Sequence, residues 1–134
     1  PTRAERRRIC KACEEDGDLD LLKEFLEAGV DPNTRDVNGE VFPDDYKAPL
    51  LYIAAHDGQH GAVDALIEAG ADVNAATAND GGTPLYIAAQ EGHTAIVSKL
   101  LQHGADKSIR GFQNETPLEA AQRKNHAAIV ALLA

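Results

Sequence analysis

Two cysteines near the start of the chain, Cys10 and Cys13, have the spacing of half a metal site or of a redox pair. A zinc site needs two further ligands, and the nearest histidines belong to later parts of the chain. Free cysteine is also among the most buried residue types in proteins. We therefore expect both thiols to be small core residues, with no metal bound.

No other group of residues shows a catalytic pattern. Ser98 and Ser108 lack a nucleophile-elbow motif, and the histidines have no partner at triad or metal spacing. The glycines after Asp80 form a turn and not a phosphate-binding loop. We expect no catalytic residues and no cofactor. An enzyme would require a polar pocket in which a histidine meets a carboxylate.

Four arginines, Arg3, Arg6, Arg7 and Arg8, make the start of the chain basic. The whole chain has 13 Lys and Arg against 22 Asp and Glu, a formal net charge of −9. Because an acidic chain is repelled by phosphates, we expect neither nucleic acid nor a membrane as partner. A hydrated end face of the fold explains the arginines better, although docking on an acidic surface is the alternative.

The helices that must position these residues are clearest in the stretch from Thr83 to Asp106. Thr83 followed by Pro84 is typical of a helix start. The break at Gly92 separates two short apolar stripes, and Gly104 is typical of a helix end. Helices this short are unstable alone, so the pair must pack against similar neighbours.

The chain repeats this unit. Tyr52-Ile53-Ala54-Ala55 recurs as Tyr86-Ile87-Ala88-Ala89 at an offset of 34 residues, and Thr83-Pro84-Leu85 recurs as Thr116-Pro117-Leu118 at an offset of 33. Four units are predicted, at about residues 3–36, 37–75, 76–108 and 109–134, within a single domain covering 1–134. An insertion at about residues 37–47 lengthens the connection between the first two units.

The period and the recurring TPLxxAA, GHxxIV and LLxxGAD patterns resemble those of ankyrin repeats over nearly the whole chain. The resemblance implies an all-α solenoid of stacked helix-turn-helix units with projecting β-hairpin fingers. It also implies that His93 and His126 brace turns through hydrogen bonds to the backbone. Asp18 and the Thr116/Glu119 capping box are expected to start helices, whereas Pro49 gives the second unit a less regular start.

The resemblance further implies that partners bind on the concave face, at finger tips and first-helix flanks. The positions that match are Asp45, Tyr46, His56, Asp57, Asn79, Asp80, Gln90, Glu91, Phe112, Gln113, Glu115, Arg123 and Lys124, and Glu15 and Asp16 extend the row into the first unit.

Aromatic side chains are the natural anchors of such a surface. We expect Phe112 and Tyr46 to contact a partner, since a finger tip has no core to enter. Phe42 is expected either to contact a partner or to fold down against its own loop. Tyr52 and Tyr86 are expected to brace the base of the fingers.

The hypothesis is a non-catalytic scaffold that binds another protein with a basic or mixed surface, and the alternative is a recruiting domain of a larger enzyme or effector. The start at Pro1 favours a processed chain or a part of a longer one. We expect a monomer and, from two cysteines without a secretory signal, an intracellular, cytoplasmic protein.

One modification site is suggested by resemblance. Asp72-Val73-Asn74, with Leu66 eight residues before Asn74, resembles sites modified by the asparaginyl hydroxylase that acts on ankyrin domains. The alternative is that Asn74 simply forms hydrogen bonds within its finger.

Overall fold

The computed structural model describes residues 2–14, 17–37, 39, 41–43 and 45–134. The elements in these ranges are α1 (Arg3–Ala12), α2 (Leu19–Glu27), β1 (Arg35–Asp36), β2 (Ala48–Pro49), α3 (Leu50–His56), α4 (His60–Glu68), α5 (Pro84–Glu91), α6 (Thr94–Gln102), the 3₁₀ turn η1 (Phe112–Asn114), α7 (Pro117–Arg123) and α8 (Ala127–Leu133).

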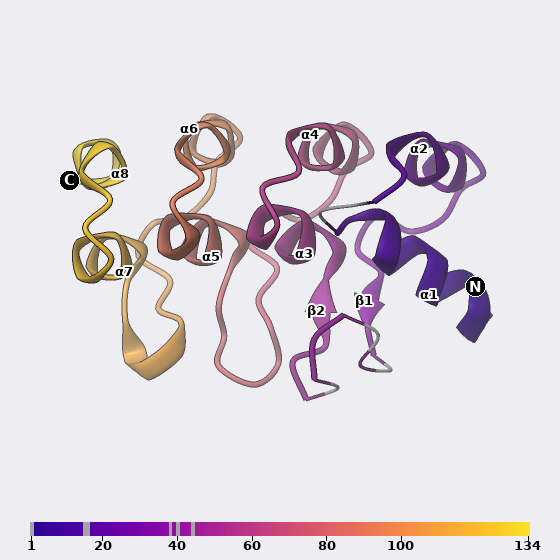
Figure 1. Ribbon diagram of the computed structural model, residues 1–134, viewed down its shortest axis with the longest axis horizontal. Coiled ribbons are helices and arrows are strands. Elements are labelled where there is room, and N and C mark those ends of the chain that lie inside the picture. Colours follow the sequence, from indigo (N-terminus) through magenta and orange to yellow (C-terminus); the bar gives the residue numbers. More distant parts are fainter. Residues whose placement is uncertain (1, 15–16, 38, 40, 44) are drawn as a thin grey trace.

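The helices form two rows (Figure 1). Helices α1, α3, α5 and α7 make the first row, and α2, α4, α6 and α8 make the second. Packing runs along the stack, with α3 against α5 and α5 against α7, and within each pair. Three fingers, residues 35–49, 75–83 and 109–116, project from the first row on the side away from the second. The expected all-α solenoid is confirmed, and each predicted unit contains one helix pair.

The helix starts follow from the capping residues. The Thr83 side chain accepts a hydrogen bond from the Tyr86 N–H at 3.2 Å, and Thr116 forms a full capping box with Glu119. Asp18 caps α2, as predicted. Helix α3 follows Pro49 and has no side-chain cap, which matches the less regular start expected there.

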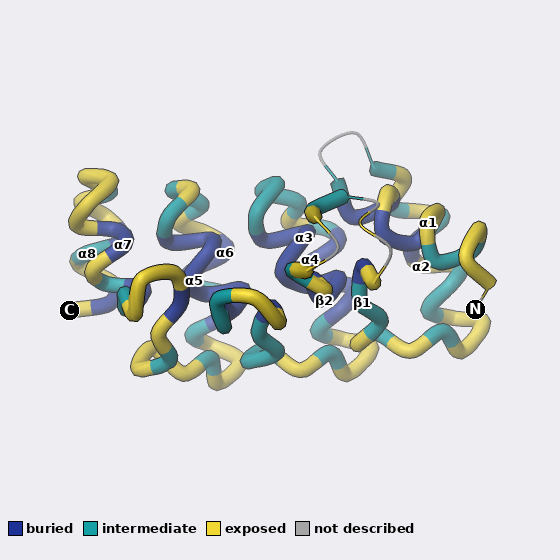
Figure 2. The backbone as a smooth tube through the Cα atoms, turned by 90° about the horizontal axis from the view of Figure 1, so that it is seen from below, coloured by how far each residue is buried: buried dark blue, intermediate teal, exposed yellow. Residues whose placement is uncertain are grey.

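Small and aliphatic residues fill the core (Figure 2). Ala54, Ala88 and Ala121 are fully buried on successive first-row helices, which allows these helices to approach closely. Cys10 and Cys13 are buried in the core and form no disulfide, so the prediction of core residues is confirmed. Burial, reinforced by neighbouring Cys10, raises the pKa of the Cys13 thiol. No group of three or more candidate metal ligands occurs in the described ranges.

Histidines link the third and fourth repeats to the repeat before each of them. His93 Nε2 lies 2.9 Å from the His56 carbonyl oxygen, and His126 Nε2 lies 3.0 Å from that of Gln90. The two rings sit directly against Gly58 and Gly92, where an added Cβ would lie 2.7 Å from a ring carbon. Both glycines also have positive φ, so no other residue fits there without strain. The predicted bracing role of the histidines thus extends across the repeat boundary.

The fingers contain less β structure than the expected hairpins. Among the described residues a strand pair is found only in the first finger, where β1 and β2 are antiparallel. The second finger is closed by a hydrogen bond from the Thr77 N–H to the Gly82 carbonyl at 2.9 Å, and the third by one from Gly111 to Glu115 at 2.8 Å. A closing bond of this kind makes a turn but is not enough for a ladder of paired strands.

No helix in the described part of the chain is long and apolar enough to cross a membrane.

Candidate functional site

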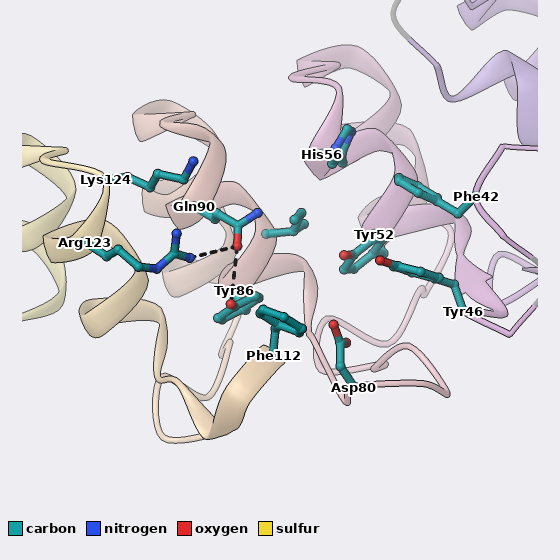
Figure 3. A pocket seen from close by; sticks show the side chains of 11 residues that line it. Phe42, Tyr46, Tyr52, His56, Asp80, Tyr86, Gln90, Phe112, Arg123 and Lys124 are labelled. Carbon is teal, nitrogen blue, oxygen red and sulfur yellow. Dashed lines mark hydrogen bonds between the residues drawn. The ribbon is translucent and has the colours of Figure 1, made fainter.

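An aromatic pocket of about 290 Å³ lies between the fingers and the first-row helices (Figure 3). The first finger contributes two rings, α3 and α5 contribute five side chains, the other fingers one each, and the end of α7 two. The lining residues are Phe42, Tyr46, Tyr52, His56, Asp80, Tyr86, Ile87, Gln90, Phe112, Arg123 and Lys124.

Phe42 is the centre of the aromatic wall. Its ring stacks on Tyr46 with centroids 5.5 Å apart, and meets the rings of Tyr52 and His56 edge to face at 5.6 and 5.0 Å. The buried Asp36 carboxylate fixes this loop by accepting hydrogen bonds from the Val41 and Phe42 N–H groups at 2.8 and 3.0 Å. Phe42 therefore folds down within its own loop, the second of the two outcomes expected for it.

Tyr46 is packed against its own finger as well as lining the pocket, and its contact with a partner stays a prediction. It is half-buried through its stack on Phe42, and its carbonyl accepts a hydrogen bond of 2.7 Å from the Ala78 N–H of the second finger. The ring therefore packs within the first finger, while the backbone joins the first finger to the second. Phe112 has 51% of its surface exposed at the tip of the third finger, which leaves it accessible to a partner, and its contact with a partner stays a prediction.

A polar network forms the wall next to α7. The Arg123 guanidinium donates to both Glu115 carboxylate oxygens at 2.9 Å, and to Gln90 at 3.2 Å. The Tyr86 hydroxyl donates to Glu115 at 2.9 Å. Burial, together with this bond, raises the pKa of Tyr86 to about 12. Tyr86 thus braces the base of a finger, as predicted, while its ring also lines the pocket.

Hydrogen bonds from Arg123 hold the pKa of Glu115 below its usual value of 4.5, against the opposing effect of burial. A carboxyl with a lowered folded-state pKa stabilises the fold above its unfolded pKa, and this contribution is lost as the pH falls through the folded pKa. We expect Glu115→Gln to destabilise the protein most above pH 5, with the difference from wild type shrinking below pH 4.5. Urea unfolding at a series of pH values measures this. A difference that grows on acidification would contradict the role of Glu115.

His56 lies at the rim between two carboxylates. Its Nδ1 faces Asp57, and its Nε2 lies 3.2 Å from Glu91. With both ring nitrogens directed at carboxylates, His56 fixes the ends of α3 and α5 relative to each other.

The remaining candidates lie around the pocket rather than in it. Asp45, Asn79 and Gln113 are exposed on the fingers. Asp57, Glu91 and Glu115 act through the neighbours they bind. Glu15 and Asp16 lie outside the described residues. The seven candidates that the structure brings together are Tyr46, His56, Asp80, Gln90, Phe112, Arg123 and Lys124.

The sequence did not predict how many pocket residues the first-row helices contribute. Tyr52, Tyr86 and Ile87 line the pocket although none was a predicted binding residue. The recurrence of Tyr52 as Tyr86 one repeat later was the signal, because both precede the flank positions His56 and Gln90 by one helical turn.

Asn74 lies at a junction between repeats. Its side-chain oxygen accepts a hydrogen bond of 2.8 Å from the Asp106 N–H, and Asn33 makes the same contact with Asp72 at 2.7 Å. Within its own finger, the Asn74 N–H donates to Asp72. Asn74 therefore forms hydrogen bonds outside its finger as well as within it, which the alternative did not include. Hydroxylation of Asn74 stays a prediction.

Comparison with known proteins agrees with this architecture. A family model described as ankyrin repeats, three copies, matches residues 9–111 and 51–134. The potassium channel KOR2 of Oryza sativa subsp. japonica is 42% identical over 69 residues, which make up 52% of this chain and 8% of the channel. The two family matches together extend over nearly the whole sequence. The chain therefore belongs to the ankyrin repeat family.

Proposed function

We propose that this chain is a non-catalytic module that binds a partner protein across the aromatic pocket, with Phe112 as its main exposed anchor. Ankyrin repeats are generally protein–protein interaction modules, which supports this role. The observation that carries it is the exposure of Phe112 beside a pocket already lined by aromatic rings. Exposed aromatic residues next to such pockets contribute most of the energy at many interfaces.

The charge of the molecule indicates what kind of surface would fit. With a net charge of −9, the protein attracts basic or mixed surfaces and repels acidic ones. Asp45, Asp80 and Glu91 lie on or around the pocket, whereas Arg123 is bound to Glu115. The partner we propose is an intracellular protein.

A catalytic role has a specific weakness. The pocket does place a histidine near carboxylates, as an enzyme would require, but both nitrogens of His56 are already directed at Asp57 and Glu91. Among the residues that the structure describes, the lining includes no serine, threonine or cysteine that His56 could activate. This arrangement favours binding over catalysis.

Phe112→Ala tests the proposal. We expect it to reduce the amount of each specific partner captured from a cell lysate by about tenfold or more, because the ring would be buried on binding. The free energy of unfolding should change by less than about 0.5 kcal/mol, since the ring is exposed in the free protein.

Leu132→Ala is the matched control, because it removes a large apolar side chain that is 40% exposed on α8, in the second row. It should leave capture unchanged. Equal capture by wild type and Phe112→Ala, measured by quantitative mass spectrometry, would contradict the assignment.

A second candidate function is recruitment on behalf of a larger protein. The observation that favours it is the match to a channel in which the shared stretch occupies only 8% of the length. Sequencing the complete reading frame distinguishes the two. A frame encoding a channel, enzyme or effector domain supports recruitment, and a frame encoding the repeats alone contradicts it.

A further inference from the structure

We infer that the pocket receives a basic side chain, lysine or arginine, from a peptide segment of the partner. The receiving surface is the wall made by Tyr46, Tyr52 and Asp80, here called the acceptor wall. This inference rests on the proposed function and specifies the chemistry of the partner at that site.

Tyr52 supplies the first argument. The side chain is almost completely buried, with 3% of the residue exposed, and its hydroxyl points into the pocket (Figure 3). Tyr86, one repeat later, satisfies the equivalent hydroxyl by donating to Glu115 at 2.9 Å. The Tyr52 hydroxyl has no such partner among the described residues. The hydroxyl is the accessible end of an otherwise buried side chain, so a ligand in the pocket can form a hydrogen bond with it in place of water.

Asp80 supplies the second argument. One carboxylate oxygen accepts hydrogen bonds from the Thr77 hydroxyl at 2.6 Å and the Gly82 N–H at 2.9 Å. These bonds fix the carboxylate in place. The other oxygen has no partner in the described part of the chain, and the group is turned toward the pocket (Figure 3).

Together with the Tyr46 hydroxyl, the wall offers three oxygens directed at one space. A lysine ammonium has three N–H donors and an arginine guanidinium has five, so either group has enough donors for all three oxygens. The nearby rings of Phe42, Tyr46 and Phe112 add cation–π attraction. At about 290 Å³, the pocket suits a single long side chain better than a larger ligand.

The electrostatics of the wall favour a cation over an anion. Burial raises the pKa of Tyr52, and the negative charges of Asp80 and Glu91 raise it further, so the phenol stays neutral and the local potential is negative. The positive groups of the pocket lie elsewhere. Arg123 is bound to Glu115, and Lys124 lies at the end of α7 across the pocket from the acceptor wall (Figure 3).

The test uses a random twelve-residue peptide library displayed on phage, selected against the intact chain. We expect the selected peptides to share a Lys or Arg at one fixed position, and to depend on Phe112. Affinities of synthetic copies are then measured by calorimetry against wild type, Asp80→Asn and Tyr52→Phe. Asp80→Asn retains an oxygen for Thr77 and Gly82, and Tyr52→Phe removes only a hydroxyl, so both variants should fold.

We expect Asp80→Asn to weaken binding about tenfold or more, because a charge-assisted bond is lost, and Tyr52→Phe to weaken it less. Glu68→Gln makes the same charge change at an exposed position of α4, away from the pocket, and should have no effect on binding. Replacing the peptide's basic residue by norleucine should weaken binding to wild type but cause little further loss with Asp80→Asn. Lysine and arginine copies compared directly show which side chain the pocket prefers.

Other outcomes overturn specific parts of this account. Three results would overturn this inference and leave the proposed function standing. In each, the selected peptides depend on Phe112. They share no basic residue, or they pair an acidic residue with Lys124, or their binding is insensitive to Asp80→Asn. A library that yields no peptide dependent on Phe112 would contradict both.

Discussion

Replacement of Leu100 by alanine is expected to lower the free energy of unfolding by about 2–5 kcal/mol, because it opens a cavity in a fully buried part of the core. Single domains have a total stability of about 5–15 kcal/mol, so the loss would be a large part of the whole. Leu100 lies in α6, which packs against α5 and α8. The change therefore weakens the contact between two repeats as well as the pair itself.

Urea unfolding followed by circular dichroism measures this loss. Because the stack is held together by contacts between neighbouring helix pairs, we also expect a shallower transition as the terminal pair begins to unfold separately. Leu132→Ala, which makes the same chemical change at an exposed position on α8, should cost less than about 1 kcal/mol. Equal losses in the two variants would show that α6 is not part of a continuous core.

Asp36→Ala is expected to have the second large effect, a loss of about 2–3 kcal/mol, because hydrogen bonds to a buried charged group are lost. The fully buried carboxylate accepts the Val41 and Phe42 N–H groups, and these bonds place the Phe42 ring over Tyr46 and Tyr52. Without them, the inserted loop should detach and the aromatic wall of the pocket should open.

Two measurements check this. Urea unfolding gives the loss in the free energy of unfolding. Methyl and aromatic NMR spectra report whether the ring-current shifts that Phe42 causes in the Tyr52 resonances disappear. Asp106→Ala is the control, since Asp106 also accepts a backbone N–H, from Ser108, but is exposed. A stable Asp36→Ala variant with unchanged aromatic shifts would show that another feature holds the loop.

The repeated architecture was predictable because its signals are local. Thr83 followed by Pro84 specifies a helix start, and Gly92, with positive φ, specifies the break. The histidines after the last two breaks, His93 and His126, follow from the resemblance to the family. Only their bond partners, each a carbonyl in the preceding repeat, required the structure.

The inserted finger was not predictable in the same way. Residues 37–47 have no apolar periodicity, and the loop takes its shape from the Asp36 carboxylate and from a contact between Tyr46 and Ala78 of the next finger. Such contacts depend on the mutual placement of two segments, which the stacking geometry sets. This is why the stacking of Tyr46 on Phe42 could not be read from the sequence.

In the pocket too, the role of a single residue depends on a contact with another segment, which the local sequence does not predict. Tyr52 and Tyr86 are equivalent in the repeat pattern, yet only Tyr86 has a carboxylate, Glu115, within reach of its hydroxyl. Glu115 belongs to the finger 29 residues later. The difference between a brace and an open hydroxyl therefore depends on the identity of one residue in the adjacent repeat.

The central claim is that aliphatic residues hold the stack together while the finger side of the first-row helices performs recognition. Amide chemical-shift mapping of the ¹⁵N-labelled chain, titrated with a peptide selected from the library, tests it most directly. We expect the shifted amides to cluster in the three fingers and in α3, α5 and the C-terminal end of α7. Shifts concentrated on α2, α4, α6 and α8 would contradict it.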